Sequence, residues 1–253
     1  MTAYNRAEFI SASIESVISS SLEDWELIIT DDQSTDNTLD IARKYEALDK
    51  RVKVFLNEKN LGDYPNRNQV AGYATGVYIK YVDADDMIYP YTLQALLGFM
   101  ERYPDAGFGV SSEASLDKPF PICIGPAEIY REHFNGFGHF DRSPGSAIIK
   151  REAFNKVKGF SGKRMIGDYE FWIKISRYYS MVKYPHGIYW NRQHNNQESK
   201  TDYAIRNYAR LKADVMNEAL EHPDLPIPKQ ELEMFIRNQK PTILKRAWKK
   251  LRN

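Results

Sequence analysis

Three aspartates stand within four residues at the end of an apolar segment. Residues 78–90 read YIKYVDADDMIYP, so Asp83, Asp85 and Asp86 directly follow a run of aromatic and β-branched side chains. Carboxylates this close repel one another, and burying them without a partner is costly. The spacing therefore predicts that a positive charge lies among them.

A second acidic pair, Asp31 and Asp32, follows the β-rich run WELIIT that begins at Trp25. Ligands of open α/β sheets bind at the carboxyl ends of the strands, and both acidic clusters are expected at such ends. Turns and helix caps favour aspartate, which accounts for one residue at each place. They do not account for five aspartates, so the two clusters are predicted to face one ligand crevice.

Carboxylate oxygens favour a hard divalent cation such as Mg²⁺ or Mn²⁺. Cys123 is the only cysteine, which excludes an intrachain disulfide and a cysteine-based metal site. Because Mg²⁺ usually takes few protein carboxylates and completes its shell with substrate phosphates, a nucleoside diphosphate or triphosphate is the expected ligand. The chain has no GxxxxGK[ST] motif, which excludes a P-loop NTPase.

Alternating helices and strands are expected to position these carboxylates. Hydrophobic spacing, caps and β-rich runs predict helices at 8–20, 36–48, 66–74, 90–103, 127–134 and 169–178, and strands at 25–30, 52–56, 77–82 and 107–111. Prolines and glycines predict loop for most of 113–166. The rhythm predicts an α/β fold with a doubly wound, mostly parallel sheet.

Net charge and hydrophobic pattern limit the classes of partner and the cellular compartment that we expect. The formal net charge of +1 argues against a nucleic-acid binder that works by bulk electrostatics. No apolar run is long enough to cross a bilayer and no signal peptide is recognised, so we expect a cytoplasmic protein. The basic end KPTILKRAWKKLRN, residues 240–253, can either contact the inner face of the cell membrane or pack as a solvated helix on the domain.

The ordered set of motifs resembles family 2 glycosyltransferases with the GT-A fold. The matching pieces are TAYNR at 2–6, WELIITDDQSTDNT at 25–38, NLG at 60–62, NRN at 66–68, ATGVYIKYVDADD at 74–86 and GDYEFW at 167–172. A single DxD match is weak because acidic triplets are common, but the order of the set is specific.

The resemblance implies roles for five residues at the donor nucleotide. Thr2 and Tyr4 match residues that line the nucleotide pocket, and Asp32 matches the carboxylate that hydrogen-bonds the base. Arg67 stands where the family often has a donor-binding arginine, with a solvated helix residue as the alternative. Asp83 matches the DxD carboxylate that binds the ribose.

The resemblance also implies a metal site and a catalytic base. Asp85 matches the DxD residue at the metal-bridged diphosphate, with Asp86 as the other candidate metal ligand. His194 resembles a downstream histidine that approaches the metal or diphosphate, and an ordinary loop role is the alternative. Asp168 matches the general base, although Gly167 replaces the usual glutamate before it and a helix-capping role stays open.

The implied function is metal-dependent, inverting transfer of a sugar from a nucleotide-diphosphate sugar, with a UDP-sugar favoured, to a hydroxyl of a saccharide or lipid-linked acceptor. Surface polysaccharide or glycan synthesis is the expected context, with Mn²⁺ or Mg²⁺ as the cofactor. Two alternatives stay open: a sugar-phosphate nucleotidyltransferase, and a catalytically inactive nucleotide-sugar-binding module. The nucleotidyltransferases usually carry a glycine-rich basic loop at the first strand end, and residues 2–6 are not one.

The order of motifs predicts how the chain is divided. Residues 1–112 form the nucleotide-sugar-binding half, 113–200 the acceptor-binding and catalytic-base half of the same domain, and 201–253 a C-terminal helical extension. The family carries an apolar strand before the position of Thr2, so the first strand of this sequence is expected to be truncated.

Overall fold

A computed structural model describes residues 1–112, 118–194 and 201–238, and its first three strands form a parallel sheet. The strands are β1 (Thr2–Ala3), β2 (Leu27–Asp31) and β3 (Val52–Leu56), in the order β1-β2-β3. Every residue of β2 is buried, which agrees with its place between two neighbours. The acidic pair predicted at a strand end therefore lies at the end of β2.

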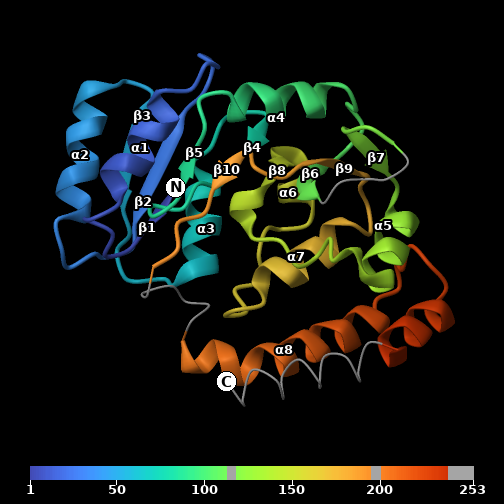
Figure 1. The fold of residues 1–253 in the computed structure, drawn as a ribbon. Helices are drawn as coiled ribbons and strands as arrows, with labels where there is room; N and C mark the ends of the chain where they lie inside the picture. The colour runs from blue at the N-terminus through green and yellow to red at the C-terminus, as the bar shows by residue number, and fades with distance from the viewer. Residues whose placement is uncertain (113–117, 195–200, 239–253) are drawn as a thin grey trace.

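Helices cover both faces of this parallel sheet. They are α1 (Ile10–Ile18), α2 (Thr38–Leu48) and α3 (Asp63–Gly72), and Figure 1 shows α1 and α2 on one side of the strands and α3 on the other. In α1, Ile10, Ile14 and Val17 recur at helical spacing and are buried. The sheet is thus wound on both sides, as the alternation of segments predicted.

The second sheet has five strands and mixed directions. Its order is β4-β8-β6-β9-β7, with β4 at Tyr78–Ile79, β6 at Phe108–Ser112, β7 at Ile122–Ile124, β8 at Ala147–Lys150 and β9 at Met181–Pro185. The pair β6–β9 is parallel, whereas β8 runs antiparallel to β4 and β6, and β7 to β9. The α/β class is confirmed, but the prediction of loop for most of 113–166 missed β7 and β8.

The remaining helices enclose the second sheet. One face carries α4 (Thr92–Glu101), and the other carries α5 (Pro126–Glu132) and α7 (Gly167–Ile175). Along β6, Phe108 packs with Trp172 of α7, while Gly109 lies under Met100 of α4. This alternation is the period of a strand buried on both faces. The other elements are α6 (Arg151–Lys156), a π-helical turn (His133–Phe137), a 3₁₀ turn (Pro144–Ser146), and the paired β5 (Met87–Ile88) and β10 (Tyr189–Trp190).

The acidic loop, residues 83–86, follows the segment that connects the first sheet to the second. The expected strand at 77–82 is shorter in the structure, since β4 ends at Ile79. A cavity of about 650 Å³ lies between β2 and the segment 74–82, and Met1 forms part of its wall. Residues 83–86 follow as a turn in which the Asp86 N–H donates to the Asp83 carbonyl over 2.9 Å.

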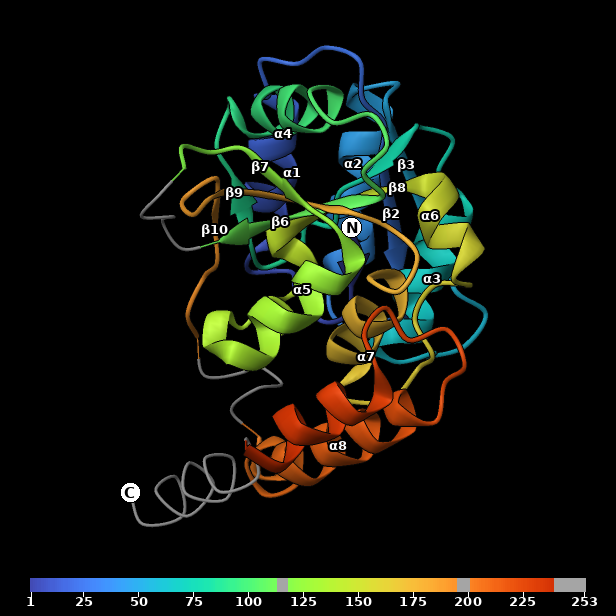
Figure 2. The same cartoon turned by 90° about the vertical axis from the view of Figure 1, so that its right-hand side faces the viewer.

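The last described helices pack on the α7 side of the domain (Figure 1). The long helix α8 (Asp202–Leu220) contacts α7, and residues 229–238 are also helical (Figure 2). Thr201 caps α8 by accepting a hydrogen bond from the Ala204 N–H at 3.2 Å. In the part of the chain that the structure describes, no helix is both long and apolar enough to cross a membrane. The prediction about the basic tail at 240–253 lies outside the described residues.

Two identical substitutions test which leucines hold this core. Leu96 of α4 is completely buried, whereas Leu48 at the end of α2 is 80% exposed. We expect Leu96→Ala to lower the free energy of unfolding by about 2–5 kcal/mol, because it removes buried methyl groups and leaves a cavity. Leu48→Ala should change that free energy by less than about 0.5 kcal/mol. Chemical denaturation of both variants measures the difference, and equal losses would contradict this assignment of the core.

Candidate active site

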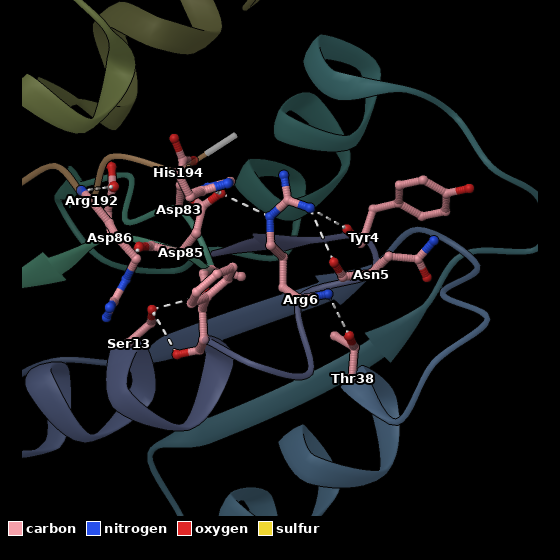
Figure 3. A network of polar contacts seen from close by, with 12 residues as sticks. Tyr4, Asn5, Arg6, Ser13, Thr38, Asp83, Asp85, Asp86, Arg192 and His194 are labelled. Carbon is pink, nitrogen blue, oxygen red and sulfur yellow. Dashed lines mark hydrogen bonds and ion pairs between the residues drawn. The ribbon is translucent and has the colours of Figure 1, made fainter. Parts of the chain in front are cut away.

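Several loops meet at the carboxyl ends of β1 and β2. Because these strands are parallel, the loops that follow them leave the same edge of the sheet. The Arg6 N–H donates to Thr38 Oγ1 at 2.7 Å, and Asn5 Oδ1 accepts from the Thr35 N–H at 2.8 Å. The acidic loop joins them from the other side, since Ser13 Oγ of α1 donates to the Ala84 carbonyl at 2.9 Å. Figure 3 shows this meeting of loops.

Asp83 is bound by Arg67, which the structure buries. Arg67 Nη1 lies 2.7 Å from Asp83 Oδ1, and its Nε lies 2.7 Å from Asp63 Oδ1. Burial alone would raise the pKa of Asp83, but the charge and hydrogen bond of Arg67 outweigh it and hold that pKa below its usual value. Only 8% of Arg67 is exposed, so the structure contradicts a solvated helix residue at this position.

Asp85 is held by two side chains from distant parts of the sequence. Its Oδ2 lies 2.8 Å from Arg6 Nε and 3.0 Å from His194 Nε2 (Figure 3). The His194 ring also stacks on Phe9, with 5.0 Å between the ring centroids. The structure thus brings together the predicted metal residues Asp85 and His194. They stand beside a hollow of about 660 Å³ that is lined by Glu8, Phe9 and residues 190–194.

Asp86 faces a different partner from Asp85. Its carboxylate accepts hydrogen bonds from the Arg192 N–H at 3.0 Å and from Asn191 Nδ2 at 3.1 and 3.2 Å. Burial, and then the neighbouring charge of Asp83, raise the pKa of Asp86 to about 7. Asp86 is only 3% exposed. Its contacts fasten the segment after β10 to the acidic loop, whereas Asp85 is the more accessible of the two carboxylates.

The donor set at Asp85 fits a hard divalent cation. Asp85 supplies a carboxylate oxygen, the ligand that Mg²⁺ and Mn²⁺ favour, and the His194 imidazole nitrogen stands 3.0 Å from it. Among the described residues no group of three or more His, Cys, Asp or Glu side chains gathers in metal-binding geometry. A cation with few protein ligands that completes its shell with substrate phosphates needs no such group.

The predicted base-binding carboxylate, Asp32, is hydrogen-bonded to other groups of the protein. Its oxygens accept from Asn57 Nδ2 at 2.7 Å and from the N–H groups of Leu61 and Gly62 at 2.8 and 2.9 Å. These bonds fix the loop before α3. The adjacent Asp31 is also buried, and within the described chain nothing donates a hydrogen bond to its Oδ2. The structure thus buries both neighbouring aspartates, and it is the Asp32 carboxylate that is hydrogen-bonded to the loop before α3.

The two remaining nucleotide-pocket residues flank this edge. Thr2 lies in β1, opposite Thr30 of β2. Tyr4 follows the strand and is 47% exposed, and Figure 3 shows its ring directed away from Arg6. An exposed aromatic ring beside a buried carboxylate is suited to stack on a flat base.

Asp168 is half-buried at the start of α7, near residues of α3. It is the second residue of α7, whereas Ile166 occupies the N-cap position, so Asp168 is not the N-cap. Its Oδ1 accepts from the Tyr169 N–H at 2.7 Å. Burial raises the pKa of Asp168 to about 6, although this hydrogen bond, the Tyr64 hydroxyl and the positive charge of Arg67 each lower it. Arg67 therefore acts electrostatically on both Asp83 and Asp168.

Three side chains of the site were missed by the sequence analysis. They are Arg6 at Asp85, Asn191 at Asp86, and Tyr64 at Asp168. Arg6 was part of the quoted TAYNR motif, so its basic charge near a predicted acidic cluster was a usable signal. For Asn191 and Tyr64 no comparable signal exists, because their partners lie 105 and 104 residues away in the chain.

The sequence is similar to known glycosyltransferases. Residues 1–158 match the family model described as glycosyl transferase family 2. A Bacillus subtilis (strain 168) protein described as a glycosyltransferase, EpsE, is 39% identical over 184 residues, which are 69% of this chain and 64% of that protein. The chain therefore spans less than two thirds of that relative's length.

The fold is similar to those of two solved transferases. The S. aureus TarS 1–349 structure in complex with UDP-GlcNAc matches with a TM-score of 0.73 at 17% identity, over 93% of this chain and 68% of that one. The mannosyltransferase PcManGT from Pyrobaculum calidifontis, in complex with GDP-Man and Mn²⁺, matches with a TM-score of 0.71 at 17% identity, over 99% and 72%. This likeness confirms the expected GT-A fold.

Replacing Arg67 tests whether the acidic cluster depends on it. We expect Arg67→Met to lower the free energy of unfolding by about 3–5 kcal/mol, because it leaves Asp83 without its buried cation. Arg43→Met is the control, since Arg43 is 46% exposed in its ion pair with Glu46 and should cost at most about 1 kcal/mol. Adding Asp83→Asn to Arg67→Met should recover part of the loss. Additive losses in this double-mutant cycle would contradict the coupling.

Proposed function

This chain belongs to glycosyl transferase family 2, and we propose that it transfers a sugar from a nucleotide-diphosphate sugar to an acceptor hydroxyl with inversion. The observation that carries the proposal is the position of Arg67. One buried guanidinium acts on Asp83, the predicted donor carboxylate, and on Asp168, the predicted base. Donor and base residues that are far apart in the sequence thus share one electrostatic site.

The donor side is assigned to the edge of the parallel sheet. Tyr4 stacks on the base, and Thr2 lines the pocket beside it. Asp32, fixed by its bonds to the Leu61 and Gly62 N–H groups, is assigned to hydrogen-bond the base. Asp83, oriented by Arg67, accepts from the ribose hydroxyls. Both structural neighbours were solved with nucleotide sugars, which supports a donor of this class and a UDP-sugar among the candidates.

The diphosphate is assigned to Asp85 and its surroundings. Asp85 and His194 would hold a Mn²⁺ or Mg²⁺ ion, which as a Lewis acid stabilises the charge of a departing diphosphate. Asp86 is assigned a supporting role, because its carboxylate is bound to Asn191 and the Arg192 backbone. Arg6 lies against the same carboxylate oxygen as His194, so its charge is available to the diphosphate as well.

The transfer step needs one base and no covalent sugar intermediate. The acceptor oxygen attacks the anomeric carbon and forms the new C–O bond. The bond to the donor diphosphate breaks, and its electron pair leaves with the diphosphate oxygen. The acceptor proton passes to the Asp168 carboxylate. Direct displacement on the face opposite the leaving group inverts the anomeric configuration.

The acceptor is assigned to the half of the domain formed by residues 113–200. This half supplies α7 with Asp168 and the β7–β9 strands, and α8 closes its lower side. A saccharide or a lipid-linked saccharide, used in surface polysaccharide synthesis, is the acceptor class that the family supports. A sugar-phosphate nucleotidyltransferase would instead release pyrophosphate from a nucleoside triphosphate. An inactive module would bind the donor without turnover.

A donor panel tests the proposed function. The purified chain should release nucleoside diphosphate from at least one nucleotide sugar in the presence of Mn²⁺. Asp85→Asn should weaken Mn²⁺-dependent binding of the nucleoside diphosphate in a calorimetric titration. Pyrophosphate released from a sugar phosphate and a nucleoside triphosphate, or donor binding without any turnover, would overturn the proposal.

Asp168→Asn should separate catalysis from binding. The variant keeps the size of the side chain but removes the proton acceptor, so we expect transfer to fall about 100-fold or more while donor binding and the melting temperature are retained. Asp214→Asn on the exposed face of α8 is the matched control and should leave transfer unchanged. Near-normal transfer by Asp168→Asn would show that the base lies elsewhere.

The rate of transfer should also depend on pH through Asp168. The reactive form is the carboxylate, and burial places its pKa at about 6. The turnover number should therefore fall as the pH drops through about 6 and reach a plateau above it. A profile that stays flat down to pH about 4, the usual aspartate range, would contradict this environment for Asp168.

A further inference from the structure

Gly167 and the ring of Tyr64 are packed too closely for any other residue at position 167. A Cβ atom built on Gly167 would lie 2.7 Å from Tyr64 Cδ2 and 2.8 Å from its Cγ and Cε2. Tyr64 is only 5% exposed, and its ring also contacts the ring of Phe160 with 5.2 Å between centroids. The ring therefore has little room to move, and α7 begins at a glycine for steric reasons.

The polar end of the same tyrosine meets the next residue, Asp168. The Tyr64 hydroxyl acts on the Asp168 carboxyl closely enough to lower its pKa against the effect of burial. One tyrosine thus packs on Gly167 and acts on the side chain of Asp168. The carboxylate is also held through its Oδ1, which accepts from the Tyr169 N–H at 2.7 Å.

We propose that Tyr64, held in place by the packing of its ring on Gly167, positions Asp168 by a hydrogen bond from its hydroxyl to the carboxylate, and that Gly167 is present because it admits the ring. The steric part depends only on the packing of α3 against α7. The catalytic part rests on the proposed function, since it takes Asp168 as the base. Tyr64 itself touches no reacting atom in this account.

The arrangement links the base to the donor side through one helix. Tyr64 and Arg67 are separated by one turn of α3, so their side chains lie on the same face. Arg67 fixes Asp83, and Tyr64 fixes Asp168. A rigid helix therefore sets the separation of the donor carboxylate and the base, which is the preorganisation that an attack on the anomeric carbon requires.

The arrangement also accounts for a departure from the pattern that the sequence resembles. Those glycosyltransferases usually carry glutamate directly before the base, whereas this chain has Gly167. A glutamate Cβ at this position would collide with the Tyr64 ring. The Tyr64 ring thus occupies the space that a side chain at position 167 would need.

Tyr64→Phe tests the hydroxyl while keeping the ring. We expect the turnover number to fall about 10-fold, the loss expected for one hydrogen bond to a charged group. The dissociation constant for a nucleoside diphosphate should not change. Tyr73→Phe is the matched control, because Tyr73 lies at the end of the same helix and its hydroxyl accepts a hydrogen bond from Gln69 Nε2 at the surface.

The pH profile of Tyr64→Phe is a second measurement, because a general loss of stability would not shift the acid limb of the turnover number. The groups that face Asp168 are Tyr64, Asp63 and Arg67 from α3, and Tyr208 from α8. Of these, Tyr64 and Arg67 lower the pKa of Asp168, and Asp63 raises it. Removing the Tyr64 hydroxyl should therefore move the acid limb of the turnover number to higher pH.

The outcomes separate the inference from the proposed function. If Asp168→Asn abolishes transfer but Tyr64→Phe leaves both the turnover number and the acid limb unchanged, the positioning role is overturned and the base assignment stands. If Asp168→Asn retains transfer, the proposed base is wrong, and the steric part is still tested by stability alone.

That stability test is a double-mutant cycle between the glycine and the ring. Gly167→Ala should shift the unfolding equilibrium at least about 10-fold toward the unfolded state, because the new Cβ meets the ring. In a Tyr64→Ala background the same change should be neutral or stabilising, since alanine favours a helix over glycine. An equal loss in both backgrounds, measured by denaturant titration, would overturn the claim that Gly167 admits the ring.

Discussion

The mutual repulsion of carboxylates at the strand ends is the constraint on which the rest of this site depends. Asp83, Asp85 and Asp86 lie in one turn, and each has a different partner. Arg67 comes from α3, and Arg6 from the loop after β1. The backbone at Arg192 comes from the segment after β10. Because no two of these partners are neighbours in the sequence, the acidic turn acts as the point at which distant parts of the chain are joined.

In the proposed function, this constraint joins the donor side and the base into one unit. Separating Arg67 from Asp83 would leave the buried guanidinium without this partner, which is costly. The ion pair therefore fixes α3 relative to the acidic turn. The same helix carries Tyr64 against the start of α7. In the proposed function, the position of the base Asp168 therefore depends on the ion pair between Arg67 and Asp83. Electrostatics at the strand ends and sterics at Gly167 together determine the geometry.

The sequence predicted the parts of this arrangement that local patterns control. The helical spacing of Ile10, Ile14 and Val17 and the apolar run of β2 gave elements close to those observed. The strand β8 was missed because AIIK is short and lies among prolines and glycines, and only its antiparallel neighbours stabilise it. The sequence predicted that the acidic clusters follow strands. It could not show that Asp85 is a better candidate metal ligand than Asp86, or which groups bind Asp32, because these depend on tertiary contacts that spacing does not encode.

The central claim is that Asp168, a half-buried carboxylate on α7, takes the acceptor proton while the acceptor oxygen directly displaces the donor diphosphate. The most direct test is the anomeric configuration of the transfer product, read by proton NMR from the anomeric coupling constant of the new linkage. A donor with an α-linked diphosphate should give a β-linked product. An α-linked product would require retention, which this site, with Asp168 as its single base, does not account for.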